Sequence, residues 1–354
     1  YNVGLDVAIL QNSLLLNIDG YIKESSGILI PVPIPAISGV TDAPFFRGAN
    51  YFTNAGSVRN TGMEAALTYR NEKNAFKFSV SPNITIVRNE VLRLEGQFGG
   101  GRPNIVENDG VSRTEEGMPI GSFFGYVTDG IIQDSAQLNS YVGVLSKTHA
   151  ASIGDFRFKD LNGDGKINAD DRTFLGKPIP TMSYGLNMRA SYKGFDFTLF
   201  LQGVEGVQVY NAQRRGLEAM IGPSNQFSPD ANQLTSVLDR WTPQNPTNDM
   251  PRAAVNDPGQ NIRPSNRWVE NADYLRIKSL QIGYSLPEKL LKRSFRTEDG
   301  ISLRFYVAFQ NLLTLTSYKG FDPELANFRA TATGFDNGSF PQSRRIMGGV
   351  QFTF

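Results

Sequence analysis

Long segments in which apolar and polar residues alternate are the strongest constraint in this sequence. Nine such segments, each between 10 and 15 residues long, cover residues 1–10, 14–23, 59–70, 75–89, 182–192, 195–205, 273–286, 302–312 and 344–354. Alternation with period two predicts β-strands that have one apolar and one polar face. Soluble strands are usually about five or six residues long, whereas a tilted strand needs about nine to eleven residues to cross a bilayer. The segment length therefore favours membrane-spanning strands.

The spacers between these segments alternate between short and long. They contain 3, 35, 4, 92, 2, 67, 15 and 31 residues. Up-and-down barrels of outer membranes join antiparallel strands by short periplasmic turns at one end and by longer extracellular loops at the other. The pattern predicts an all-β fold, namely part of an antiparallel transmembrane β-barrel with long extracellular loops.

The charged residues of the segments fall on their polar faces. In the segment 75–89, for example, Phe76, Phe78 and Val80 alternate with Lys77 and Ser79. A Lys or Arg that faces lipid at the middle of the bilayer costs about 2–4 kcal/mol. We therefore expect Lys77, and likewise Arg189 and Arg304, to face a wet interior.

One segment changes its alternation midway. In residues 273–286, Leu275 and Ile277 share one parity, whereas Leu280, Ile282 and Tyr284 share the other. A β-bulge adds one residue to a strand and shifts the facing of everything beyond it. The sequence predicts such a bulge near Lys278.

Composition excludes several other classes of protein. Lys and Arg total 35 against 34 for Asp and Glu, so no net positive charge attracts nucleic acid. The absence of cysteine excludes disulfides, thiolate metal sites and a cysteine nucleophile. The sequence contains no run of 18 apolar residues, so it predicts no transmembrane helix. A soluble β-sandwich or propeller remains the alternative, because alternation also separates a protein core from water.

The last segment resembles a closing barrel strand. Residues 345–354 place apolar residues at alternate positions and end on an aromatic residue. An exposed strand of this kind aggregates unless another strand pairs with it. This pattern resembles the signal that the barrel-assembly machinery recognises, which would consist of Val350, Phe352 and Phe354.

Several motifs in order along the chain resemble one family. They are the runs 54–64, 154–165, 240–243 with 251–252, 274–278 before 283–284 and 287, and 310–312 before Tyr318, Gly320, Asp322 and Pro323. Together they resemble the C-terminal part of SusC-like TonB-dependent transporters (RagA/SusC family) of Bacteroidota outer membranes.

This resemblance implies a larger assembly. Barrels of this type have about 22 strands around a plugged lumen, so residues 1–354 would be the nine C-terminal strands of one barrel domain. The N-terminal plug, which contacts TonB, would be absent from this chain. The resemblance further implies a multi-pass location in the lipid of a Gram-negative outer membrane, a SusD-like lipoprotein as partner, and import of a large nutrient such as an oligosaccharide or peptide.

The long spacers 90–181 and 206–272 would then be extracellular loops. The first contains an EF-hand-like segment at 160–171, in which a Gly follows three oxygen-bearing positions. We expect Ca²⁺ to bind there through Asp160, Asn162, Asp164, the carbonyl of Lys166, Asn168 and Asp171. The last position departs from the motif, because Asp replaces Glu and reaches less far. A turn held by its own side chains is the simpler interpretation.

The second loop carries two further features. Residues 228–241 have helical spacing with Ser228 as the N-cap, and the resulting face would pack the loop itself or dock a partner. Arg214 and Arg215 could bind a substrate carboxylate or a partner, although a solvated pair is the simpler interpretation.

Signs of enzymatic chemistry are scarce. The sequence contains no Gly-x-Ser-x-Gly elbow and no Walker loop. We therefore expect a transporter rather than an enzyme. The alternatives are a secreted or surface-attached β-rich binding module braced by calcium, and a surface glycoside hydrolase, which would need two carboxylates about 5–10 Å apart.

Overall fold

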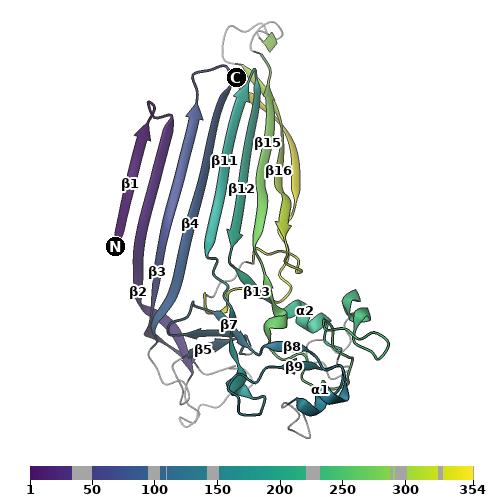
Figure 1. The fold of residues 1–354 in the computed structure, drawn as a ribbon. Coiled ribbons are helices and arrows are strands. Elements are labelled where there is room, and N and C mark those ends of the chain that lie inside the picture. The colour runs from purple at the N-terminus through teal and green to yellow at the C-terminus, as the bar shows by residue number, and fades with distance from the viewer. Residues whose placement is uncertain are drawn as a thin grey trace.

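The computed structural model describes residues 1–33, 50–94, 104–108, 110–141, 151–220, 232–287, 290–291, 301–325 and 330–353. Its main element is a nine-stranded antiparallel sheet in the order β1-β2-β3-β4-β11-β12-β15-β16-β18 (Figure 1). The strands are β1 (Asn2–Ile9), β2 (Leu14–Pro33), β3 (Asn50–Asn71), β4 (Lys77–Leu94), β11 (Met182–Tyr192), β12 (Phe195–Glu205), β15 (Tyr274–Ser285), β16 (Ser302–Thr316) and β18 (Arg345–Thr353). All nine predicted strands are confirmed, and each pairs with its neighbours in the predicted up-and-down order.

The two ends of the sheet differ as the spacer lengths predicted. In Figure 1 the short connections lie at the upper end of the sheet, and the folded parts of the long connections lie at the lower end. We call these the turn end and the loop end. β2 and β3 extend further toward the loop end than their alternation indicated, reaching Pro33 and beginning at Asn50. Gly27 has a φ of 67° within β2, where the register with β3 shifts.

The bulge predicted near Lys278 is confirmed. The pairing of β15 with β16 shifts between Ile277 and Ser279, and its pairing with β12 shifts between Phe200 and Leu201. Lys278 is the residue left over. The extra residue returns Leu280 and Ile282 to the same face as Leu275 and Ile277, so one face of β15 stays apolar along its length.

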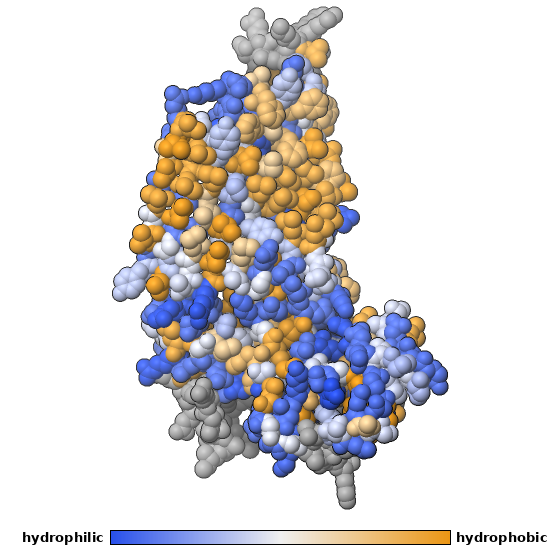
Figure 2. Space-filling model, in the orientation of Figure 1, coloured by the Kyte–Doolittle hydropathy of each residue, from blue (hydrophilic) through white to orange (hydrophobic). Residues whose placement is uncertain are grey.

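The apolar face of this sheet is open rather than packed. Large hydrophobic side chains from strands across the sheet are between 43% and 61% exposed; they include Leu5, Ile22, Met63, Phe195, Ile282, Phe305 and Val350. Figure 2 shows this apolar surface over the strands and hydrophilic surface at the loop end. A soluble sandwich would bury these side chains against a second sheet, so that alternative is not supported.

The buried hydrophobic clusters lie mainly at the loop end. They comprise Val58, Val91, Leu94 and Ile105; Val111, Phe123, Tyr210 and Trp268; Ile131, Phe156 and Phe158; and Val209, Ala272 and Tyr318. The long loops thus supply most of the packed core, in a unit that we call the loop body.

Short strands and helices build the loop body. A four-stranded sheet contains β10 (Thr173–Gly176), β7 (Ser122–Gly125), β6 (Ser112–Glu115) and β5 (Asn104–Glu107), and β8 (Thr128–Ile131) pairs with β9 (Phe156–Phe158). A third sheet joins β14 (Val269–Asn271), β13 (Gln208–Asn211) and β17 (Phe335–Asp336). The helices are α1 (Ser135–Ser140) and α2 (Ala212–Leu217), with 3₁₀ turns at Ala169–Asp171, Thr235–Asp239, Asn266–Trp268 and Ala330–Ala332.

The helix predicted over 228–241 is wrong for the part that the structure describes. Ser228 lies outside the described residues, and only Thr235–Asp239 form a 3₁₀ turn. Val237 is buried, whereas Leu238 is 72% exposed. Trp241 does not lie on the apolar face of the predicted helix. Its indole Nε1 instead donates to Gln133 Oε1 at 2.9 Å.

No helix among the described residues is long and apolar enough to cross a membrane.

Candidate functional site

The polar face of the nine-stranded sheet carries hydrogen-bonded side chains between neighbouring strands. Asn17 donates to Asp6 at 2.5 Å, and Thr68 donates to Ser81 at 3.0 Å. Near the turn end, Arg304 makes a bidentate pair with Asp196 at 2.8 and 2.5 Å. A continuous polar face of this kind suits contact with water or a hydrophilic ligand.

The predicted facing of the charged strand residues agrees with the strand registers. Lys77 lies opposite Ser191, and Arg189 lies between Ser79 and Thr198. Residues directly opposite each other in an antiparallel pair point to the same face. These cations therefore share the polar face with hydroxyl-bearing neighbours, away from the apolar side chains.

Asp155 is the centre of the loop body. Its carboxylate is fully buried and accepts four hydrogen bonds: from Arg252 Nε and Nη2 at 2.9 and 3.1 Å, from Asn261 Nδ2 at 3.0 Å, and from the Ser152 amide at 2.8 Å. A buried charge is tolerated when it is paired and hydrogen-bonded in this way. Asp155 thus ties the first long loop to the second, about 100 residues away in sequence.

The residue before Asp155 explains the close packing around it. Gly154 has a φ of 93°, and a Cβ at this position would lie 2.5 Å from the ring of Trp241. The Arg252 amide donates to the Gly154 carbonyl at 2.8 Å. Two of the motifs that carried the family resemblance, 154–165 and 240–243 with 251–252, therefore meet in space.

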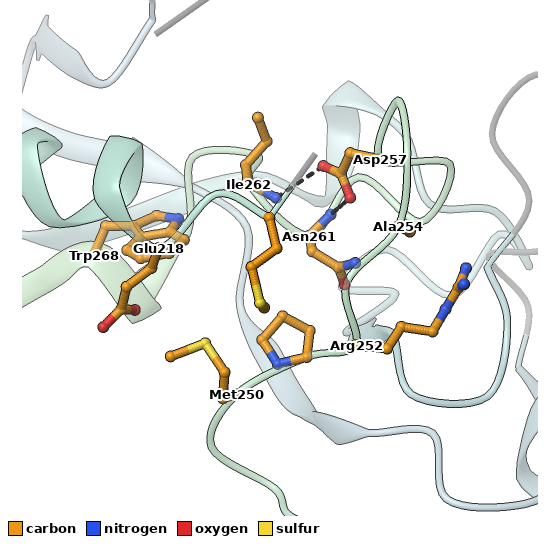
Figure 3. A pocket seen from close by; sticks show the side chains of 10 residues that line it. Glu218, Met250, Arg252, Ala254, Asp257, Asn261, Ile262 and Trp268 are labelled. Atoms are coloured by element: carbon orange, nitrogen blue, oxygen red, sulfur yellow. Dashed lines mark hydrogen bonds between the residues drawn. The ribbon is translucent and has the colours of Figure 1, made fainter. Parts of the chain in front are cut away.

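Asp257 forms a second buried acceptor next to Asp155. Its oxygens accept from the amides of Asn261 and Ile262 at 2.8 and 3.0 Å, which Figure 3 shows. Burial raises the pKa of this carboxyl, and the two amides oppose the shift. Met250, Arg252, Trp268 and neighbouring residues enclose a pocket of about 10 Å³ here, which is room for about one water molecule. The pocket is too small for a substrate.

Arg214 and Arg215 do not form the solvated pair of the simpler interpretation. Arg214 is only 11% exposed and pairs with Glu218 and Glu270, each at 2.9 Å. Arg215 is buried, and its Nε donates to the Ile262 carbonyl at 2.6 Å. Arg214 is therefore already paired with carboxylates, and both side chains hold α2 against the rest of the loop body.

The spacer 313–343, which we call the third long loop, is attached to the polar face of β15 by ion pairs. Arg276 pairs with Asp322 at 2.5 Å and with Glu324 at 2.8 Å, and Lys278 pairs with Glu324 at 2.6 Å. Beyond this cluster, the Tyr318 hydroxyl donates to Asp336 at 2.5 Å, and burial raises the pKa of that phenol. The bulge at Lys278 allows both basic side chains to reach Glu324.

The EF-hand-like segment adopts a tight loop whose oxygens accept from its own backbone. Asp160 accepts from Gly163 and Gly165 at 2.7 and 2.8 Å, and Asp171 from Leu161 and Asn168, each at 2.8 Å. Asn162, Asp164 and Asn168 accept from the amides of residues 164, 166 and 170. Within the described part of the chain, no three His, Asp or Glu side chains are grouped closely enough to hold a metal ion. Calcium binding stays a prediction.

Two of the three residues of the predicted assembly signal lie on the strand β18. Val350 and Phe352 are 61% and 47% exposed in β18, an edge of the nine-stranded sheet. Phe354 lies outside the described residues.

The contacts that organise the loop body could not be predicted from the sequence. Asp155 and Arg252 stood inside recognised motifs, but nothing in their local sequence indicated that they pair. Arg276 also stood inside such a motif, whereas Asp257 and Asn261 carried no signal of their own, because hydrogen bonds between residues far apart in sequence have no local pattern.

Comparison with known proteins finds relatives of the whole chain and solved structures with the same fold. No protein-family model matches the chain. The whole chain is 33% identical to a stretch covering 34% of TonB-dependent receptor P3 from Formosa agariphila. It is 27% identical to a stretch covering 31% of TonB-dependent receptor SusC from Bacteroides thetaiotaomicron. Among solved structures, the RagAB peptide transporter superposes on the whole chain with a TM-score of 0.77 and 27% identity, over 34% of its own chain.

The chain thus spans about one third of the length of these relatives. The relatives are transport receptors rather than enzymes, as expected from the sequence. Similarity extends over the strands and the loop body alike, and the whole chain is similar to about one third of these SusC-like TonB-dependent receptors.

Proposed function

We propose that this chain forms part of the wall of an outer-membrane transporter that imports a large nutrient, such as an oligosaccharide or a peptide, with energy delivered through TonB. The observation that carries the proposal is the sheet with two unlike faces. Its apolar face is exposed over the span of the strands, whereas its polar face bears charges and amides. Such a sheet is stable where one face meets hydrocarbon and the other meets water.

The loop body supports an extracellular capture role. It gathers the long loops at one end of the sheet and packs them on buried clusters of their own. In barrels of this type long loops lie outside the cell. The loop body would therefore meet the nutrient first and would carry the SusD-like surface lipoprotein. TonB would act through the plug that the resemblance implies.

The two faces can be tested with adjacent residues of one strand. Because the chain contains no cysteine, a nitroxide can be attached at Leu199→Cys on the apolar face of β12 or at Thr198→Cys on the polar face. In liposomes, electron paramagnetic resonance should show that dissolved oxygen reaches residue 199 and that a water-soluble nickel chelate reaches residue 198. Equal nickel accessibility at both positions would contradict a lipid-facing wall.

Import and partnership need a cellular test. Disruption of the gene in its source bacterium should abolish growth on one class of large nutrient, either oligosaccharides or peptides, and should spare growth on the monomers. The tagged receptor should co-purify with a surface lipoprotein. Unchanged growth on both classes of nutrient would contradict the import function.

A further inference from the structure

The segment Tyr318–Leu325 is fixed over the loop end of the polar face. The Arg276 side chain that holds it is only 2% exposed, and Asp322 is 6% exposed. Asp322 also accepts from the Gln342 amide at 2.9 Å, which joins the two ends of the third loop. The segment is held near one end by the buried Arg276–Asp322 ion pair and at the other by the hydrogen bond from Tyr318 to Asp336. It therefore has little conformational freedom, so groups that it presents are positioned in advance of any ligand.

This fixed segment encloses a pocket against the end of β16. The pocket has a volume of about 270 Å³, and its lining includes Arg276, Asn311, Thr316, Phe321, Gln342 and Arg344. Phe321 is 63% exposed although the neighbouring Asp322 is buried. A rigid exposed aromatic ring beside polar groups is a combination typical of ligand sites. The volume is near the lower end for a ligand pocket, so it fits one sugar ring or one peptide residue.

The charges around the pocket do not cancel. Arg276 and Lys278 are balanced by Asp322 and Glu324, so this cluster is neutral. Arg344 lines the same pocket and has no ion-pair partner among the described residues. A guanidinium binds a carboxylate through two parallel hydrogen bonds. The excess positive charge therefore favours an anionic ligand.

We infer that this pocket is a subsite for a carboxylate-bearing ligand, with Arg344 binding the carboxylate and Phe321 packing against the adjacent apolar surface. The inference deepens the proposed import function, on which it rests. The carboxylate has two chemical sources, the C-terminus of a peptide or the acid group of a uronic sugar.

Four probes separate these sources. They are N-acetyl-trialanine, its C-terminal amide, a glucuronic-acid disaccharide and the neutral glucose disaccharide. Binding to the detergent-purified receptor is measured by saturation-transfer NMR titration, which detects weak ligands without any need for transport. At least one acid should bind at least tenfold more tightly than its neutral counterpart, and Phe321→Ala should weaken that binding. The acid that binds identifies the source.

The variants Arg344→Gln and Arg345→Gln form the matched pair. Both remove one charge at adjacent positions, but Arg345 does not line the pocket, and its Nε donates to Ser343 Oγ. Arg344→Gln should remove the tenfold preference for the acid, whereas Arg345→Gln should retain it. Equal binding of acids and neutral probes, equal loss in both variants, or no binding of any probe would overturn the inference. None of these results affects the nitroxide test of the wall, so failure of the subsite is distinguishable from failure of the proposed function.

Discussion

Asp155 shows how much of the loop body depends on single residues. The sequence placed it in a recognised motif, but its role emerges only because Arg252 and Asn261 reach it from about 100 residues away. A local pattern predicts strands because facing repeats every two residues. It cannot predict a pair whose members are about 100 residues apart, so the central contact of the site could not be predicted from the sequence.

Replacing Asp155 should loosen the loop body. Asp155→Asn keeps the size of the side chain but replaces one carboxylate oxygen by an NH₂ group, which would lie against the N–H donors of Arg252 and Asn261. We expect a loss of about 3 kcal/mol in local stability. Hydrogen exchange of peptides covering 152–158 and 250–262 measures this loss. The control is Asp129→Asn, whose ion pair with Arg157 is 48% and 36% exposed and should cost less than about 1 kcal/mol. Similar losses in both variants would contradict the central role of Asp155.

Asp160 predicts a dependence on pH within the tight loop 160–165. The amides of Gly165 and Gly163 that donate to its carboxylate lower its pKa below the ordinary value of 3.8. The stabilisation is therefore present above pH 3.8 and lost as the pH falls through the lower pKa of the folded loop. Exchange of these two amides, corrected for the intrinsic effect of pH, should accelerate at the acidic end. In the variant Asp160→Asn the corrected exchange rates of these two amides should be fast and independent of pH. If the rates in this variant still depended on pH, titration of Asp160 would not be the cause.

At the scale of elements, regular strands were predictable and irregular extensions were not. The change of parity in residues 273–286 foretold the bulge at Lys278, because a membrane wall tolerates no flip of its apolar face. The last ten residues of β2 were missed, since Gly27, Pro31 and Pro33 normally end a strand. The helix predicted over 228–241 failed in its described part because Trp241 packs against Gly154 and Gln133, and tertiary contacts override helical spacing there.

Deleting Lys278 should prevent assembly of the wall. Without the extra residue, Arg276 would turn toward the apolar face while Leu275 and Ile277 turned toward the polar one, and an arginine in the bilayer costs about 2–4 kcal/mol at the midplane and less near its edges. The substitution Lys278→Met keeps the bulge and removes only the ion pair with Glu324. Heat-modifiable migration on SDS gels should be lost in the deletion and retained in the substitution. Retention in both would show that the bulge is dispensable.

The loop 160–171 stays a predicted calcium element. Its backbone amides already engage the oxygens of Asp160, Asp164 and Asp171, and among the described residues no three carboxylates are grouped closely enough to hold a metal ion. We expect weak binding, with a Kd of roughly 0.1–1 mM as in extracellular calcium modules. Calcium should slow hydrogen exchange across the loop, magnesium should not, and Asp164→Asn should abolish the effect. Exchange that is the same with calcium and with EGTA would exclude the site.

At the scale of the whole molecule, the nine-stranded sheet was predictable from the sequence and the loop body was not. In the nine-stranded sheet each strand pairs with the next wall strand along the chain. The strand order therefore follows the chain order and can be predicted without knowledge of contacts between distant residues. The loop body depends on pairings such as Tyr210 with Phe335, 125 residues apart, made by strands of two to four residues. Strands that short carry too few alternating positions to stand out from a loop.

The parallel pairing of β13 with β17 has a consequence for biogenesis. The two strands lie 125 residues apart, so this sheet of the loop body cannot form until the whole segment between them has been synthesised. Contacts between such distant residues form slowly, because the intervening chain must first lose conformational freedom. We therefore expect this sheet of the loop body to form after the wall, whose strands pair with their neighbours in the chain.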